Sequence, residues 1–383
     1  MAKPKILVIS FSNIAQDARV LREISAIAQH GEVTSVGYGK KPENSTIHIE
    51  LPKNAPSLPQ TIPGILKLAL RMHTRAELSA PGSIAAMKLL EGKKFDLIVA
   101  NDARAIPLAF KVSQGSPVWA DMHEWARGER TQILAWRILI APLMDHICKK
   151  YLPACNAVTT VSGTIAELYQ QEYKIKKPLL IRNAPAYIDL PPSQCAKDGK
   201  IQLVHSGGAV AGRNIEAMIT AVKQLEDRFT LDLYLIPAND GGKYLESLHK
   251  LAGDDERIQF HDPVKPDELA KTLNQYDVGI YWMPPVHLNA KLALPNKFFD
   301  FVQARLAIAV GPTAEMSALI NKYKIGWVSE GFEIESIVST LNSLTTEKVA
   351  AAKQATVPAA KDLNFDNESK VIEDILQDLL GSI

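Results

Sequence analysis

Short runs of apolar residues alternate with amphipathic stretches along the whole chain. In the first half, the runs are rich in β-branched residues without polar alternation, which is typical of parallel strands buried on both faces. Helix-like stretches lie between them, such as Asp17–His30 with apolar residues at helical spacing. This alternation predicts an α/β fold with a doubly wound sheet. The expected strands are Lys5–Ser10, Val33–Tyr38, Phe95–Ala100, Val118–Asp121 and Ala157–Val161.

The pattern breaks at residues 183–200, which are rich in proline and polar residues and are typical of a linker. A second series of strands follows, and we therefore expect two Rossmann-like domains facing a cleft, at residues 1–185 and 186–363. Residues 364–383 are expected to form a C-terminal helix that packs back on the first domain. The second series comprises Ile201–His205, Leu231–Ile236, Arg257–Phe260, Asp277–Trp282, Ala307–Val310 and Gly326–Ser329.

The composition narrows the class of protein. The 383 residues include 43 Lys and Arg against 42 Asp and Glu, a net charge of +1 that argues against nucleic acid as the main partner. Three cysteines without CxxC spacing favour reduced thiols over a disulfide framework. We find neither a signal-peptide pattern nor an apolar run of about 18 residues. These features predict a cytoplasmic protein.

A glycine-containing turn follows the first strand of the second domain. Gly207 and Gly208 end that strand, and Asn214 or a neighbour begins a helix. Glycines let backbone N–H groups approach an anion, and Arg213 adds a guanidinium suited to phosphate oxygens. A tight turn with a solvated arginine fits the spacing equally well, since neither a complete GxGxxG nor a Walker pattern is present.

The stretch LPNKFFDFVQARLAIAV, residues 294–310, predicts a helix at Asn296–Arg305 followed by a strand. Lys297 and Asp300 are three residues apart and share one face of its first turn. Lys297 is suited to a diphosphate and Asp300 to the two hydroxyls of a ribose. An ion pair between them is an equally good interpretation of the spacing.

Polar residues also follow three strands of the first domain. Because the carboxyl ends of parallel strands share one edge of a sheet, these residues predict a ligand cleft there. A histidine at such a position either contacts a polar substrate or is a structural residue with its hydrogen bonds satisfied. The residues are Asn13 and Asp17 after the first strand, Asn101 and Asp102 after the next, and His123 and Glu124 within WADMHEW.

Several motifs are absent from the sequence. We find no GxSxG, HExxH or GxxxxGK[ST] pattern, and the loop after the first strand, FSNIAQDAR, contains no glycine. These absences argue against a serine hydrolase of that type, a zinc peptidase, a P-loop NTPase and a dehydrogenase. No DxD-like metal pair follows a strand, so we expect no metal site.

Taken together, these segments resemble the retaining GT-B glycosyltransferases of the family 4 type. The resemblance covers essentially the whole chain, and its most specific part is the PNK helix with the strand after it. Other parts are Asp17–Gly39, DMHEW, Thr159–Tyr173, IRNAP at 181–185 and HSGG…GRNIEAM.

The resemblance implies a UDP- or GDP-sugar donor in the C-terminal domain and a saccharide or lipid-linked acceptor in the N-terminal domain. It implies transfer with retention, with the departing phosphate oxygen as base and without metal or cofactor. The catalytic residues would be His123, Arg213 and Lys297, with His123 against the donor sugar. The donor-binding residues would be Gly207, Gly208, Arg213, Asn296, Lys297 and Asp300, and the acceptor-binding residues Asn13, Asp17, Asp102 and Glu124.

Three positions depart from the family pattern. Leu292 stands where the first glutamate of a paired-glutamate motif is usual, Gly208 where arginine is common, and Asp300 where glutamate is usual. Two other functions therefore stay open: a non-catalytic glycosyltransferase-like subunit, and a nucleotide-sugar epimerase of the same architecture.

Two basic, apolar stretches have helical periodicity, Ile62–Arg75 and Trp136–Tyr151. Family members that use lipid-linked acceptors dock on the inner membrane face through such a surface. A packed helix with a solvated basic face has the same pattern.

Overall fold

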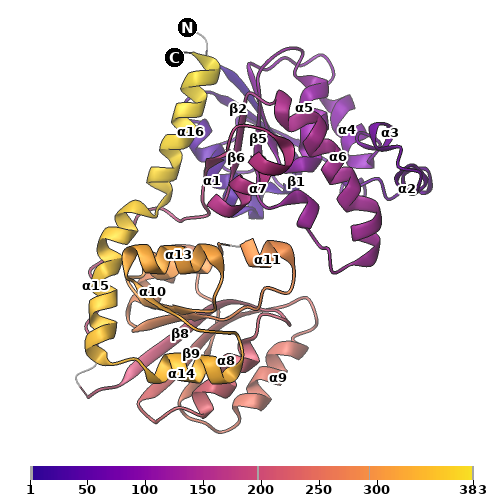
Figure 1. Ribbon diagram of the computed structural model, residues 1–383. Helices are drawn as coiled ribbons and strands as arrows, with labels where there is room; N and C mark the ends of the chain where they lie inside the picture. Colours follow the sequence, from indigo (N-terminus) through magenta and orange to yellow (C-terminus); the bar gives the residue numbers. More distant parts are fainter. Residues whose placement is uncertain (1–2, 196–197, 293, 382–383) are drawn as a thin grey trace. The chain divides into compact units, whose positions relative to one another are not determined.

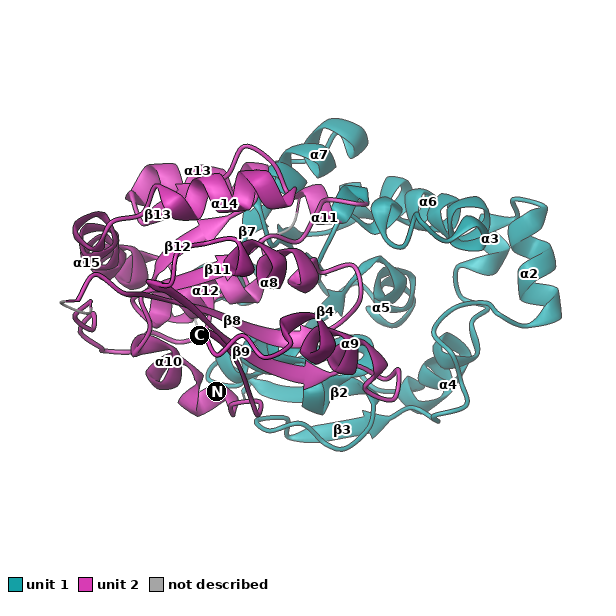
Figure 2. Ribbon diagram, turned by 90° about the horizontal axis from the view of Figure 1, so that it is seen from below, with its two compact units in different colours: residues 1–182, 287–289, 368–383 teal, residues 183–286, 290–367 magenta. Residues whose placement is uncertain are grey.

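The chain forms two compact units in the computed structural model, which describes residues 3–195, 198–292 and 294–381. The first unit contains residues 1–182, 287–289 and 368–383, and the second contains residues 183–286 and 290–367 (Figure 2). Among the described residues, no helix is long and apolar enough to cross a membrane.

The first unit is built on a sheet of seven parallel strands in the order β3-β2-β1-β4-β5-β6-β7. Its central strands β4 and β5 are buried along their whole length. The strands are β1 Lys5–Asn13, β2 Glu32–Tyr38, β3 Ile47–Glu50, β4 Leu97–Asn101, β5 Val118–Met122, β6 Ala157–Thr160 and β7 Leu179–Leu180. The helices are α1 Ala18–Ile27, α2 Ile62–Ala69, α3 His73–Ala76, α4 Pro81–Leu90, α5 Ile106–Val112, α6 Ala141–Tyr151, α7 Gly163–Tyr173 and most of α16 Phe365–Leu380.

The second unit contains six parallel strands in the order β10-β9-β8-β11-β12-β13. They are β8 Ile201–Ala209, β9 Phe229–Pro237, β10 Ile258–His261, β11 Val278–Tyr281, β12 Ala307–Val310 and β13 Gly326–Val328. Its helices are α8 Ile215–Lys223, α9 Lys243–Ala252, α10 Pro266–Asn274, α11 Leu288–Leu292 (of which residues 288–289 belong to the first unit), α12 Asn296–Gln303, α13 Ala314–Tyr323, α14 Ile334–Asn342 and α15 Thr346–Asp362.

Successive side chains of a strand in the second unit enter different apolar cores. Leu203 packs with residues of α8, α9 and α14, whereas Val204 packs with residues of α10, α12 and α13. The two groups of helices lie on opposite faces of the sheet (Figure 1). This double covering explains why the strands are apolar without alternation.

The predicted fold is confirmed, with two Rossmann-like α/β units. Every strand expected from the apolar runs is present within a few residues of its predicted bounds. The sequence reading missed β3, an edge strand of four residues, and β7, which has only two. Such short edge strands carry too few apolar positions to show a pattern.

Strand order reverses beside one strand in each sheet. In the first unit β1 lies between β2 and β4, and in the second β8 lies between β9 and β11. The connecting segments leave to opposite sides at these points and open a crevice at the carboxyl ends of the strands. A ligand site is therefore expected beside β1 and β4 in one unit, and beside β8 and β11 in the other.

Candidate functional site

A lysine packs onto a glycine at the carboxyl end of β8 in the second unit. Gly207 has φ +132°, and a Cβ there would collide with Nζ of Lys297. Only glycine therefore lets the ammonium lie against the backbone of this turn. Arg213 lies on the same turn, where its Nη1 donates to the carbonyl of Gly208 over 3.3 Å.

The helix that carries Lys297 is fixed by aromatic packing. Pro295 precedes α12, and Phe298, Phe299 and Phe301 are all buried in the core. With that face inside, Lys297 is left partly buried in the first turn, while Asn296 is exposed. The PNK sequence thus brings Lys297 to the glycine turn.

The surroundings of Lys297 disfavour its positive charge. Burial and, to a smaller extent, the nearby Arg213 cation lower its pKa, Asp300 opposes them, and the net result is a pKa of about 8. Two cations held together with partial desolvation are costly to charge. An anion at this turn would relieve that cost, because it neutralises both.

A buried histidine completes this turn, and the sequence analysis did not select it. His205 is fully buried, its Nδ1 bonds to the carbonyl of Ile280 over 2.9 Å, and its Nε2 has no partner among the described residues. Burial, with Lys297 and Arg213 nearby, lowers its pKa to about 3. His205 is therefore neutral and adds no third charge.

A buried network occupies the corresponding edge of the first unit. Arg19 of α1 binds Asp121 at the end of β5 through two bonds of 2.8 and 2.7 Å, and both side chains are almost fully buried. Arg19 also donates to the carbonyl of Ile181 over 2.7 Å. Burial alone would raise the pKa of Asp121, but Arg19 and His123 hold it well below its usual range.

His123 lies among carboxylates and an amide oxygen. Its Nε2 is 2.8 Å from Oδ1 of Asn101 and 3.2 Å from Oδ2 of Asp121, and its Nδ1 is 3.5 Å from Oδ2 of Asp102. Burial alone lowers its pKa, but Asp102 and Asp121 outweigh that and raise it to about 9. His123 is consequently an imidazolium at neutral pH.

Glu23 joins the same network from α1. Its Oε2 accepts from Nδ2 of Asn101 over 2.9 Å, and its Oε1 has no hydrogen-bond partner among the described residues. Burial, followed by the charge of Asp121, raises its pKa to about 8. Glu23 therefore keeps its proton at neutral pH. Sequence reasoning missed Arg19 and Glu23, because a charged residue in an amphipathic helix looks solvated until the fold buries it.

The other predicted acceptor residues have varied surroundings. Burial and the neighbouring Glu129 and Asp102 raise the pKa of Glu124 to about 7. Asp17 caps α1 by accepting from the backbone N–H of Val20 over 3.3 Å. Asn13 donates to Oε1 of Gln16 over 3.0 Å. Asp17 and Asn13 thus have local structural roles.

Solved structures resemble the fold of this protein over nearly the whole chain. A glycosyltransferase from Rickettsia africae is 13% identical with a TM-score of 0.68, covering 100% of both chains. Sucrose-phosphate synthase from Thermosynechococcus elongatus is 12% identical with a TM-score of 0.71, covering 98% of this chain and 99% of that one. The chain has the GT-B fold. HepE from Anabaena, solved with UDP and glucose, is also similar, at 14% identity and a TM-score of 0.67 over 98% of this chain and 100% of that one.

The GT-B likeness is one of structure alone. No protein-family model matches the sequence, and no curated protein is similar to it in sequence. Within the described part of the chain, no group of three or more His, Cys, Asp or Glu residues is arranged to hold a metal ion.

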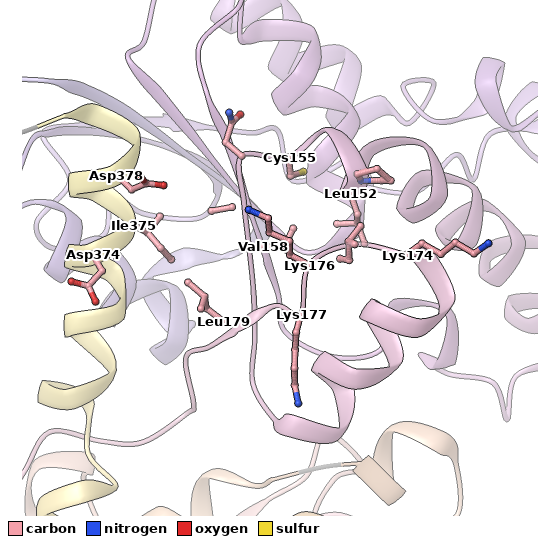
Figure 3. Close-up of a pocket in the computed structure, with 14 residues that line it drawn as sticks. Leu152, Cys155, Val158, Lys174, Lys176, Lys177, Leu179, Asp374, Ile375 and Asp378 are labelled. Atoms are coloured by element: carbon pink, nitrogen blue, oxygen red, sulfur yellow. The ribbon is translucent and has the colours of Figure 1, made fainter.

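The first unit also contains a cavity of about 520 Å³. Leu179 and Val158 lie on its wall near the starts of β7 and β6, and Asp374 and Asp378 of α16 face it from another side (Figure 3). It therefore lies toward the amino ends of the strands, opposite the edge that carries His123. In open α/β sheets the ligand edge is the carboxyl edge, so we do not assign the reaction to this cavity.

Proposed function

We propose that the chain is a retaining glycosyltransferase that uses a UDP- or GDP-sugar as donor and a saccharide or lipid-linked saccharide as acceptor. The observation that carries the proposal is the pair of cations, Lys297 and Arg213, held on the glycine turn at the carboxyl end of β8. The GT-B fold supports it, and the UDP-bound structure of HepE is of a protein with that fold.

Lys297 and Arg213 have the chemistry that the reaction needs. When the bond between the sugar and the nucleoside diphosphate breaks, negative charge develops on the leaving phosphate. Prepositioned cations stabilise that charge, and losing one such contact typically costs about 2.7–4 kcal/mol, or 100- to 1000-fold in rate. In our proposal these two cations act without a metal, and the departing phosphate oxygen takes the acceptor proton.

The remaining donor contacts follow from the same turn and helix. Gly207 and Gly208 let Lys297 and Arg213 lie close to the backbone, where they would meet phosphate oxygens, and Asn296 is exposed at the start of α12. Asp300, one turn after Lys297, would accept hydrogen bonds from the ribose hydroxyls. Leu292 is buried and apolar, so the family's first glutamate has no polar substitute at this position.

The first unit would bind the acceptor at the edge that carries Asp102, His123 and Glu124. Carboxylates there are suited to accept hydrogen bonds from sugar hydroxyls. Asn13 at the end of β1 and Asp17 at the start of α1 extend the same edge, although both also make the local bonds described above.

A basic, apolar surface of the first unit supports a lipid-linked acceptor. Ile62, Leu66 and Leu70 on and after α2 are 85%, 58% and 61% exposed. Arg71 follows them and donates to the carbonyl of Ile138 over 2.7 Å, which ties α2 to the helical turn at Trp136–Ile140. Apolar side chains beside basic ones are the composition of helices that lie at the surface of anionic membranes. We propose peripheral contact there.

The donor proposal is tested by thermal unfolding of the full chain with UDP, GDP, ADP and CMP and with their sugars. A ligand at 100 times its Kd adds about 2.7 kcal/mol of stability. We expect one nucleoside diphosphate to raise Tm, and Lys297→Ala to abolish that shift. Lys271→Ala, which removes an exposed lysine of α10 in the same unit, should keep it. If none of the nucleotides raises Tm, the proposal is wrong.

A further inference from the structure

The backbone of Asp102 has a conformation that non-glycine residues rarely adopt. Its φ is +67° and its ψ is 160°, between the last residue of β4 and the turn at Ala103–Ala105. This region of φ/ψ space is essentially restricted to glycine, because the Cβ of other residues clashes there. A side chain at this position is therefore kept at a cost to stability.

Backbone hydrogen bonds hold Asp102 in this strained conformation. The N–H of Asp102 donates to the carbonyl of Asp121 over 2.9 Å, and its own carbonyl accepts from the N–H of Ala105 over 3.0 Å. The side chain is fixed too, since Oδ1 accepts from the backbone N–H of His123 over 3.2 Å. The strained backbone thus holds a carboxylate in one orientation.

The ring of His123 faces acceptors through both of its nitrogens. Asp121 is ionised by its pair with Arg19, so its oxygen 3.2 Å from Nε2 requires a proton on that nitrogen. Nδ1 faces the other carboxylate, Asp102, at 3.5 Å. Both nitrogens therefore face oxygen acceptors of the protein, Nε2 toward Asn101 and Asp121 and Nδ1 toward Asp102.

The charges of His123 and of the groups around its ring sum to zero. Arg19 and Glu23 come from α1, Asp121 from β5, and Asp102 from the segment after β4. Arg19 and His123 are positive, Asp121 and Asp102 are negative, and Glu23 keeps its proton. Of this set, the carboxylate of Asp102 is the most open to solvent, with its side chain 32% exposed against 19% for His123 and 2% for Asp121.

We propose that Asp102 is the group that binds acceptor hydroxyls, and that His123 is a positioning residue that clamps Asp102. The proposal rests on the glycosyltransferase function proposed above and deepens it. It moves the substrate contact from His123, where the sequence prediction put it, to the strained carboxylate. The ligand chemistry is a sugar with neighbouring hydroxyls, since one oriented carboxylate accepts from two donors.

The first test compares Asp102→Gly with Asp102→Ala in the full chain. Both variants lack the carboxylate, so their difference reports the backbone alone. We expect the glycine variant to have the higher Tm by roughly 2–4 °C, the opposite of the usual order. A higher Tm for the alanine variant would show that the position is unstrained and would overturn the proposal.

The second test follows the imidazole of His123 by NMR with labelled histidine, identifying its resonance by its loss in His123→Gln. In the wild type it should titrate well above pH 7, and Asp102→Asn should bring its midpoint down toward 6.5. A wild-type midpoint near the ordinary value would refute the clamp. This readout and the Tm comparison need no substrate, so they decide the clamp even if the glycosyltransferase proposal fails.

The third test measures turnover, with UDP-glucose and GDP-mannose as donor probes and octyl glucoside as acceptor probe. Asp102→Ala should raise the KM for the acceptor about tenfold or more, the loss of one charge-assisted hydrogen bond, and leave the donor KM unchanged. His123→Gln should act in the same direction, more weakly. A fall in kcat with unchanged acceptor KM in His123→Gln would mean that His123 itself contacts the reacting groups. If no combination of donor and acceptor probe reacts, the proposed glycosyltransferase function is rejected. The Tm and NMR results still decide whether His123 holds Asp102.

Discussion

The two units present opposite electrostatic designs at equivalent edges of their sheets. In the second unit, Lys297 and Arg213 repel one another on a glycine turn, and the buried histidine beside them stays neutral. In the first unit, each cation faces a carboxylate: Arg19 pairs with Asp121, and His123 lies between Asp121 and Asp102. The edge of the second unit therefore has an excess of positive charge, which Asp300 offsets only in part, whereas the charges at the edge of the first unit balance.

This difference indicates what each edge is suited to bind. A site with uncompensated positive charge gains most from a diphosphate, because the ligand removes a cost that the protein bears alone. A compensated site gains nothing from another ion, and offers oriented hydrogen-bond acceptors to a neutral sugar instead. The division matches a charged donor in one unit and a polyhydroxyl acceptor in the other.

Arg19→Met should have the largest effect on the edge of the first unit that carries Asp121 and His123. It removes one of the two cations that face the buried carboxylate of Asp121, and breaking a buried pair in this way costs about 3–5 kcal/mol. Chemical denaturation should show this loss in the first unit. Lys177→Met is the matched control, because it breaks a pair with Glu167 whose side chains are 47% and 55% exposed. Exposed pairs contribute about 1 kcal/mol or less. Equal losses in the two variants would contradict the buried network.

Gly207→Ala is the most direct test of the edge of the second unit that carries Lys297 and Arg213. The new methyl group would displace the ammonium of Lys297, so nucleotide affinity and turnover should fall about 100-fold or more, as when one such cation is removed. Gly212→Ala is the control in the same loop. Gly212 also has a positive φ, of +86°, but no atom lies within 4 Å of its added Cβ. It should lose some stability and keep its affinity. Similar affinity in both variants would refute the contact with Lys297.

The sequence predicted the second edge better than the first. Gly207, Arg213 and Lys297 were selected because a glycine turn and a short helix show themselves in local spacing. The partners in the first unit are far apart in the chain, since Arg19 and Asp121 are separated by 102 residues. Their pairing depends on strand order, which no local pattern reveals.

The backbone conformation of Asp102 could not be predicted from the sequence either. Asp102 was placed correctly after its strand, but nothing in ANDAR indicates a φ of +67°. His123 was selected by position, and its role was open between substrate contact and structure. Only the surrounding oxygens, from three separate elements, show that both of its nitrogens are used.

The pH dependence of donor binding distinguishes the edges further. The pKa of Lys297 is lowered to about 8, so its ammonium is present below that pH and lost above it. Affinity for the nucleotide-sugar donor should be constant near pH 7 and weaken by up to about tenfold per pH unit above 8. In Lys297→Arg, whose side chain stays charged, any remaining affinity should not change with pH over this range. An identical profile in both proteins would assign the titration to another group.

The smallest expected effect concerns the apolar surface around α2, which belongs to the compensated unit. Exchanging both Leu66 and Leu70 for glutamine should weaken binding to vesicles rich in phosphatidylglycerol by roughly five- to tenfold, because less apolar surface enters the headgroup region. The control is Leu89→Gln in α4, a leucine of the same unit that is 44% exposed. It should bind as the wild type does. If the wild type itself does not co-sediment with these vesicles, the acceptor must be reached without a membrane, and a soluble saccharide becomes the substrate to test at Asp102.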